Sequence, residues 1–150
     1  VLDVALAKNS NVTVFVNWGW NFKNANLKPG AEGLLFPPES PKAGQRWCGK
    51  DKFELQQMID SSYQKHAAGK KVTLAMVGKA WLSLQKAGLV GEDDLYLQDD
   101  WSHPSLLGSY VEALVLTRDS LKLDIAKVTY IPAGIDPKLA NTIRTFLAKK

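Results

Sequence analysis

Val72-Thr73-Leu74-Ala75-Met76-Val77 is an unbroken run of apolar and β-branched residues, and Gly78 follows it directly. A run of this length and composition is typical of a β-strand that is covered on both faces. Val12-Thr13-Val14-Phe15-Val16 has the same character. We therefore predict two buried strands, at 12–16 and 72–77, and they decide the fold class.

Segments with helical periodicity surround these strands. We expect helices at residues 1–8, from Asp51 to Gly69, at about 79–86, from Pro104 onward, and from Asp136 with Pro137 in its first position. Apolar residues at helical spacing predict that the second of these helices faces the core. Alternating helices and strands indicate one α/β domain with a parallel sheet. Two strands are few for such a sheet, so the fold looks incomplete.

Residues 19–50 are rich in proline and glycine, and we expect them to form a long irregular loop that covers part of the domain. Two of its tryptophans, Trp20 and Trp47, are candidates for lining a sugar-binding cleft. Trp18 and Trp81 are at least as well explained as core residues. Cys48, the single cysteine, excludes an intrachain disulfide and is interpreted as a loop thiol without a role.

Composition argues against several classes of partner. The net charge is +4, but the basic residues are scattered, so no nucleic-acid surface is expected. No stretch approaches the roughly 18 apolar residues of a membrane span. No set of side chains has the spacing of a zinc or EF-hand site, and we expect neither a metal nor another cofactor. His66 lies among lysines and is interpreted as a solvated surface residue.

Asp100 and His103 are the residues with the clearest chemical potential. A carboxylate three residues before an imidazole, across a turn, can accept a hydrogen bond from Nδ1–H and leave Nε2 for a nucleophile. Pro104 would then begin the next helix. The residues alone leave an alternative open, in which Asp100 or Ser102 caps that helix and His103 is a surface residue.

The block Asp100–Ser105, with Gly108-Ser109-Tyr110 after it, resembles the last conserved block of the SGNH (GDSL-type) hydrolase superfamily. More specifically, it is similar to a bacterial branch that reads D-G-x-H-P-S-x-x-G-x-Y-L-A-A. Two upstream segments fit the same branch: Val14–Trp18 is similar to a strand ending in threonine-tryptophan, and Val77–Trp81 to the motif V-G-x-A-W.

The resemblance covers residues 1–117 in order and approximate spacing, whereas 118–150 corresponds to a variable tail. Two departures stand out. Trp101 replaces the usual glycine, which could change the shape of the loop or the access of substrate, and Asn17 replaces threonine.

The resemblance implies part of a flavodoxin-like three-layer α/β/α sandwich, with the site at the carboxyl ends of the strands. It makes His103 the general base and Asp100 its orienting partner in a serine-type carboxylester hydrolase. The substrate would be a small-molecule or carbohydrate ester. A serine in a strand-to-helix turn and an oxyanion hole would complete the site.

None of the nine serines lies in a turn of the Gly-Asp-Ser kind. We therefore expect 1–150 to be the C-terminal half of the enzyme domain, lacking its N-terminal strands and nearly inert alone. An N-terminal polypeptide would complete the sheet. A non-catalytic α/β binding or scaffold module and a fragment that pairs with itself are the alternatives. The cellular location is left open, a secreted or periplasmic bacterial protein being one option.

Overall fold

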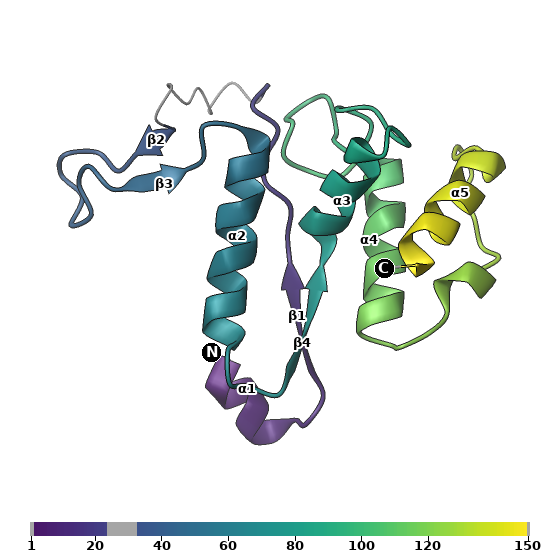
Figure 1. The fold of residues 1–150 in the computed structure, drawn as a ribbon, viewed down its shortest axis with the longest axis horizontal. Helices are drawn as coiled ribbons and strands as arrows, with labels where there is room; N and C mark the ends of the chain where they lie inside the picture. The colour runs from purple at the N-terminus through teal and green to yellow at the C-terminus, as the bar shows by residue number, and fades with distance from the viewer. Residues whose placement is uncertain (1, 24–32, 150) are drawn as a thin grey trace.

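The computed structural model describes residues 2–23 and 33–149 (Figure 1). Its elements in chain order are α1 (Leu2–Lys8), β1 (Val12–Val16), β2 (Leu34–Leu35), β3 (Arg46–Cys48), α2 (Lys52–Ala67), β4 (Val72–Met76), α3 (Val77–Lys86), α4 (Leu106–Asp119), the 3-10 helix η1 (Ile125–Lys127) and α5 (Pro137–Ala148). Helices and strands alternate around a parallel pair of strands, so the predicted α/β class is confirmed.

β1 and β4 pair in parallel, in a register that places Val12 opposite Val72 and Val16 opposite Met76. Their carboxyl ends therefore lie at the same edge of the sheet. Figure 1 shows the two strands between α2 on one side and α4 on the other, with α5 outside α4. Within residues 2–23 and 33–149, neither strand has a further neighbour in the sheet.

The buried core lies mainly among the helices that follow the sheet. Its largest side chains come from α3, α4 and α5 and their connections, and include Trp81, Leu84, Val111, Ile143 and Leu147. The prediction that both strands are covered on both faces is wrong at most positions. Each strand has one neighbouring strand, and a single helix lies on either side of the pair. Most side chains of β1 and β4 are therefore only half-buried.

The apolar stripe expected on α2 is also only partly in the core. Leu55 and Gln56 are the residues of α2 that are buried, whereas Phe53 is 42% exposed. The ammonium groups of Lys52 and Lys86 lie 5.2 and 5.4 Å from the Phe53 ring centre. Cations placed this way cover the aromatic face that the core does not.

Several predicted boundaries are confirmed and others are wrong. Asp51 caps α2 and Asp136 caps α5, as expected. α3 begins directly at Val77, with no linker after β4. α4 begins after Ser105 rather than at Pro104. The segment expected to be an irregular loop contains the short antiparallel pair β2–β3; its residues 24–32 lie outside the described residues.

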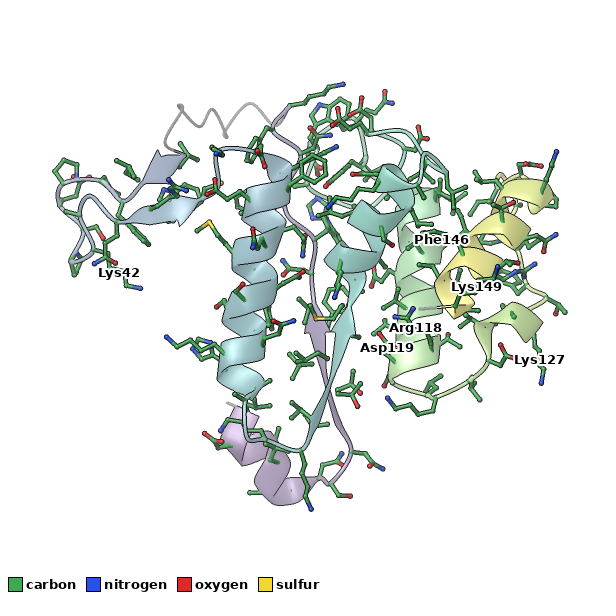
Figure 2. The ribbon with its side chains drawn as sticks, in the orientation of Figure 1. Lys42, Arg118, Asp119, Lys127, Phe146 and Lys149 are labelled. Atoms are coloured by element: carbon green, nitrogen blue, oxygen red, sulfur yellow. The ribbon has the colours of Figure 1, made fainter. Side chains whose placement is uncertain are left out.

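Arg118 joins the last two long helices. Its Nη1 donates to the carbonyl oxygen of Leu147 at 3.0 Å, while its Nε and Nη2 bind the Asp119 carboxylate at 2.6 and 2.9 Å. Figure 2 shows Arg118 and Asp119 on α4 where it faces α5. In the described part of the chain, no helix is both long enough and apolar enough to cross a bilayer.

Gly108 sets the distance between α4 and the segment before it. A Cβ atom at this position would lie 2.2 Å from the carbonyl oxygen of Leu95 and 2.9 Å from Trp81 Cζ2. We expect Gly108→Ala to lower the free energy of unfolding by about 1–3 kcal/mol, because backbone must move to admit the methyl group. Urea denaturation measures this. Ser109→Ala, at the exposed neighbouring position, is the control and should change stability by less than about 0.5 kcal/mol. Equal stability of the two variants would contradict the close packing.

Candidate functional site

Asp100 and His103 are in direct contact. Asp100 Oδ1 accepts hydrogen bonds from the backbone N–H groups of Ser102 and His103 at 2.8 and 2.9 Å. Asp100 Oδ2 lies 2.5 Å from His103 Nδ1. A carboxylate can only accept, so Nδ1 carries the proton, and in the neutral ring Nε2 is the acceptor. The His103 side chain is 73% exposed, so Nε2 is available to a substrate.

The three donors also stabilise the negative charge of Asp100. Hydrogen bonds from the backbone of His103, then from the backbone of Ser102, and then from the His103 ring hold the pKa of the Asp100 carboxyl well below its ordinary range. Asp100 is therefore ionised wherever the imidazole can act as a base.

The capping alternative from the sequence is wrong. Ser105 caps α4, since its hydroxyl oxygen accepts from the backbone N–H of Gly108 at 3.0 Å and its hydroxyl donates to the carbonyl of Asp94 at 2.6 Å. Ser105, and neither Asp100 nor Ser102, is therefore the N-cap residue of this helix. The same alternative also predicted that His103 is a surface residue, and its side chain is indeed exposed.

The turn that carries the pair is closed at its base by backbone hydrogen bonds. Leu97 N donates to the carbonyl of His103 and Trp101 N to the carbonyl of Leu97, both at 2.9 Å, and Tyr96 bridges Pro104 in antiparallel fashion. Trp101 has a φ of 56°, the left-handed region that side chains other than glycine rarely adopt. This is the position at which the resembled family has glycine.

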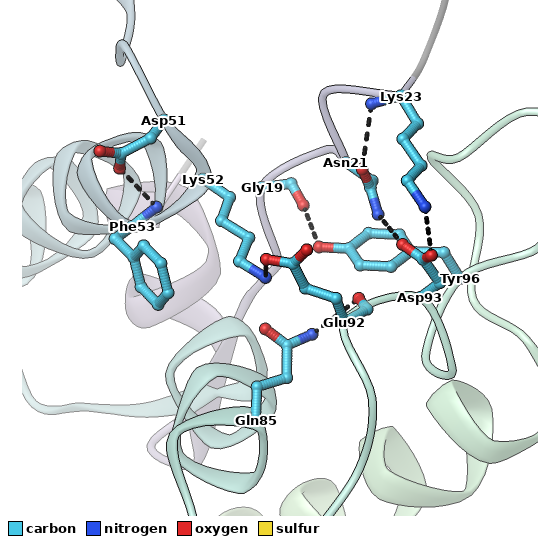
Figure 3. Close-up of polar contacts among 10 residues, drawn as sticks. All are labelled: Gly19, Asn21, Lys23, Asp51, Lys52, Phe53, Gln85, Glu92, Asp93 and Tyr96. Atoms are coloured by element: carbon cyan, nitrogen blue, oxygen red, sulfur yellow. Dashed lines mark hydrogen bonds and ion pairs between the residues drawn. The ribbon is translucent and has the colours of Figure 1, made fainter. Parts of the chain in front are cut away.

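The turn lies beside the chain that leaves β1. The indole N–H of Trp18 donates to the carbonyl of Ser102 at 2.8 Å, and the backbone N–H of Asn21 donates to the carbonyl of Trp101 at 2.9 Å. The Tyr96 hydroxyl donates to the carbonyl of Gly19 at 2.8 Å (Figure 3). The pair therefore lies at the carboxyl edge of the sheet, where ligands bind in open α/β folds.

One salt bridge and one hydrogen bond cross this junction at its rim. The Asp93 carboxylate accepts a hydrogen bond from Asn21 Nδ2 at 3.0 Å and forms a salt bridge with Lys23. The Lys23 ammonium also lies 5.0 Å from the Trp101 ring centre. Figure 3 shows both side chains reaching from the segment after β1 to Asp93. Lys23 lowers the pKa of Asp93, since its ammonium binds the carboxylate.

Three aromatic side chains next to the turn contact one another. Trp18 stacks on Trp81 with ring centres 4.4 Å apart and planes at 11°, and Tyr96 meets Trp81 edge-on at 5.0 Å. Trp81 is buried, so its predicted place in the core is confirmed, and Trp18 packs against the same cluster.

The structure brings Trp20 and Trp47 together, though not with His103. Both line a pocket of about 160 Å³ whose walls also include Trp18 and Cys48, and His103 is not among its lining residues. Trp20 is 44% and Trp47 39% exposed. The loop interpretation of Cys48 is wrong: it lies in β3, is fully buried, and burial raises the pKa of its thiol.

Other candidate chemistry is sparse. No group of three or more histidine, cysteine or carboxylate side chains suited to a metal occurs in residues 2–23 and 33–149. His66 is exposed on α2 with Nδ1 2.7 Å from the carbonyl of Ser62, in agreement with its interpretation as a surface residue. Sequence reasoning missed Gln56 and Tyr96, which bind the backbone after β1 through contacts far apart in the chain.

Comparison of the chain with protein-family models, with curated proteins and with solved structures finds no match. The candidate site therefore stands on its own geometry, and the SGNH resemblance stays a prediction.

Asp100→Asn tests whether the carboxylate selects the tautomer of His103. The variant keeps the shape of the side chain but can place an N–H opposite Nδ1, which removes the preference for a proton there. At alkaline pH, where imidazole rings are neutral, we expect the Nδ1–H tautomer of His103 to dominate in the unaltered protein and to lose its majority in the variant. Long-range ¹H–¹⁵N NMR spectra report the tautomer. His66, in the same spectrum, is the internal control and should not change. A His103 ring that favours Nε2–H before substitution would contradict the geometry.

The pKa values of Asp100 and Asp60 should depart in opposite directions from the ordinary aspartate value of about 3.9. Hydrogen bonds lower the pKa of Asp100, whereas burial raises that of Asp60. The backbone amide shifts of Ser102 and His103 should have a titration midpoint below the ordinary value, and the side-chain amide of Gln56, which contacts Asp60, a midpoint above it. A group with a lowered folded pKa stabilises the fold fully above its unfolded pKa and loses that contribution as the pH falls. Acid should therefore loosen the turn. Coincident midpoints would refute the assignment.

Proposed function

We propose that this chain supplies the acid–base pair of a serine-type carboxylester hydrolase of the SGNH kind. His103 is the general base and Asp100 its orienting partner. One observation supports this above the others: a carboxylate that is itself fixed by two backbone N–H groups lies 2.5 Å from Nδ1 of an exposed imidazole. This arrangement fixes the ring and directs its basic nitrogen outward.

The chemistry follows from the free nitrogen. Nε2 of His103 takes the proton of a serine hydroxyl as its oxygen attacks the ester carbonyl, and the imidazolium then gives that proton to the departing alkoxide. Asp100 stabilises the imidazolium without becoming protonated itself. Water repeats the cycle on the acyl-enzyme, releasing the acid and restoring the serine.

Neither serine beside His103 is suited to be the nucleophile. Ser102 Oγ lies 3.4 Å from Nδ1, the nitrogen that Asp100 already occupies. The Ser105 hydroxyl is used in the cap of α4. We therefore place the serine and the oxyanion hole on polypeptide outside residues 1–150, an N-terminal segment whose strands would complete a flavodoxin-like sandwich around β1 and β4.

A carbohydrate ester is the substrate class that the surroundings favour. Trp20 and Trp47 present half-exposed indoles at one small pocket, and Trp18 both lines that pocket and donates to the turn of His103. Indole faces offer an apolar surface with a polar edge, which suits the C–H and O–H faces of a sugar ring.

A non-catalytic α/β binding or scaffold module is the second candidate. The high exposure of His103 and the lack of a serine facing its Nε2 among the described contacts favour it. In that case the turn serves to fasten the segment after β1 to α4, and the pocket of Trp20 and Trp47 is the binding site.

The decisive experiment uses the whole native protein that contains this sequence. His103→Ala should lower kcat/KM for hydrolysis of p-nitrophenyl acetate by about 100- to 10,000-fold, because the general base is lost. The matched control is His66→Ala, which removes an exposed histidine of α2 and should leave the rate unchanged. A fluorophosphonate probe should label one serine, and far more slowly in His103→Ala. Undiminished hydrolysis by His103→Ala, or no labelled serine, would favour the binding module.

A further inference from the structure

Gln56 is a polar side chain on the face of α2 that is turned toward the core, beside the buried Leu55. It lies on α2, is 2% exposed, and uses both ends of its amide. Its Oε1 accepts from the backbone N–H of Gly19 at 2.7 Å, and its Nε2 donates to the carbonyl of Asn17 at 3.1 Å and to Asp60 Oδ1 at 2.8 Å. Buried amides are retained without loss of stability only when they are bonded in this way.

The two backbone groups that Gln56 binds stand on either side of Trp18. A single amide therefore fixes the chain both before and after this residue, directly beyond the end of β1. Trp18 in turn donates its indole N–H to the carbonyl of Ser102, the residue before His103, at 2.8 Å. The hydrogen bonds of Gln56 and that of the Trp18 indole are joined through the covalent structure of Trp18, and together they connect α2 to the turn of Asp100 and His103.

α3 leaves the space that this amide needs. A Cβ atom on Gly78 would lie 2.2 Å from both Nε2 and Oε1 of Gln56. Gly78 and Trp81 belong to the segment that resembles V-G-x-A-W. Its glycine admits Gln56 on one side, and its tryptophan stacks on Trp18.

We propose that Gln56 is a positioning residue for His103: its amide fixes the backbone around Trp18, and Trp18 holds the turn at the carboxyl edge of the sheet. Its role in catalysis rests on the proposed function. Its effect on the turn does not, because the order of the turn is measurable in a protein without activity. If Gln56 had a purely structural role, its substitution would instead speed hydrogen exchange equally throughout the domain.

Gln56→Met separates these roles, because methionine keeps the length and volume but forms none of the three hydrogen bonds. We expect hydrogen exchange of the Trp18 indole N–H and of the Leu97 amide, which donates to the carbonyl of His103, to become about 10-fold faster. The amide of Val111 in the helical core should keep its rate. Gln57→Met, at the exposed neighbouring position, is the matched control and should leave all three rates unchanged. Equal acceleration at Val111, or no acceleration at Trp18 and Leu97, would overturn the proposal.

Gly78→Ala reaches the same contact from α3 and should give the same local pattern if Gln56→Met fails to fold. In the whole native protein, Gln56→Met should lower kcat for ester hydrolysis more than it changes KM. If the unaltered protein hydrolyses no ester, the proposed function fails while the exchange result still decides the role of Gln56. If hydrolysis is present and the exchange rates do not change, the positioning role fails alone.

Discussion

The indole of Trp18 is the contact on which the candidate site depends. Its face stacks on Trp81 in the helical core, and its N–H binds the carbonyl of Ser102. Stacking alone would allow the ring to slide, and a single hydrogen bond alone would allow it to swing. Together they fix the end of β1 relative to the turn of His103. The buried core around α3 and α4 thereby supports the exposed pair.

The two strands, two of the helix caps and the Asp100–His103 contact could be predicted from the sequence, because each depends on residues that are close together in the chain. The two strands follow from their apolar runs, and the caps of α2 and α5 follow from aspartates at helix starts. The Asp100–His103 contact also spans only three residues, a spacing that a turn closes by itself. The beginning of α4 was misplaced because Pro104 and Ser105 are both favourable at a helix start, and the bridge of Pro104 to Tyr96 decided between them.

The rest depends on partners that are distant in the chain. Gln56 is 37 residues from Gly19, and Tyr96 is 77 residues from the same glycine. No periodicity reveals such pairs, and a glutamine on a helix is normally placed in solvent. The prediction for Phe53 was wrong in the opposite direction: the apolar stripe of α2 placed its ring in the core, whereas two lysines cover it at the surface. Residues that join separate elements are where reasoning from one sequence fails.

β4 passes into α3 without an intervening residue. A strand and helix joined in this way have no hinge between them, because the hydrogen bonds of both elements restrain the backbone where it would have to bend. The direction in which α3 leaves the sheet is therefore set by the end of β4 itself. α3 thus gives Trp81 one defined orientation at this edge of the sheet, and the indole of Trp18, which binds the turn of His103, stacks on it.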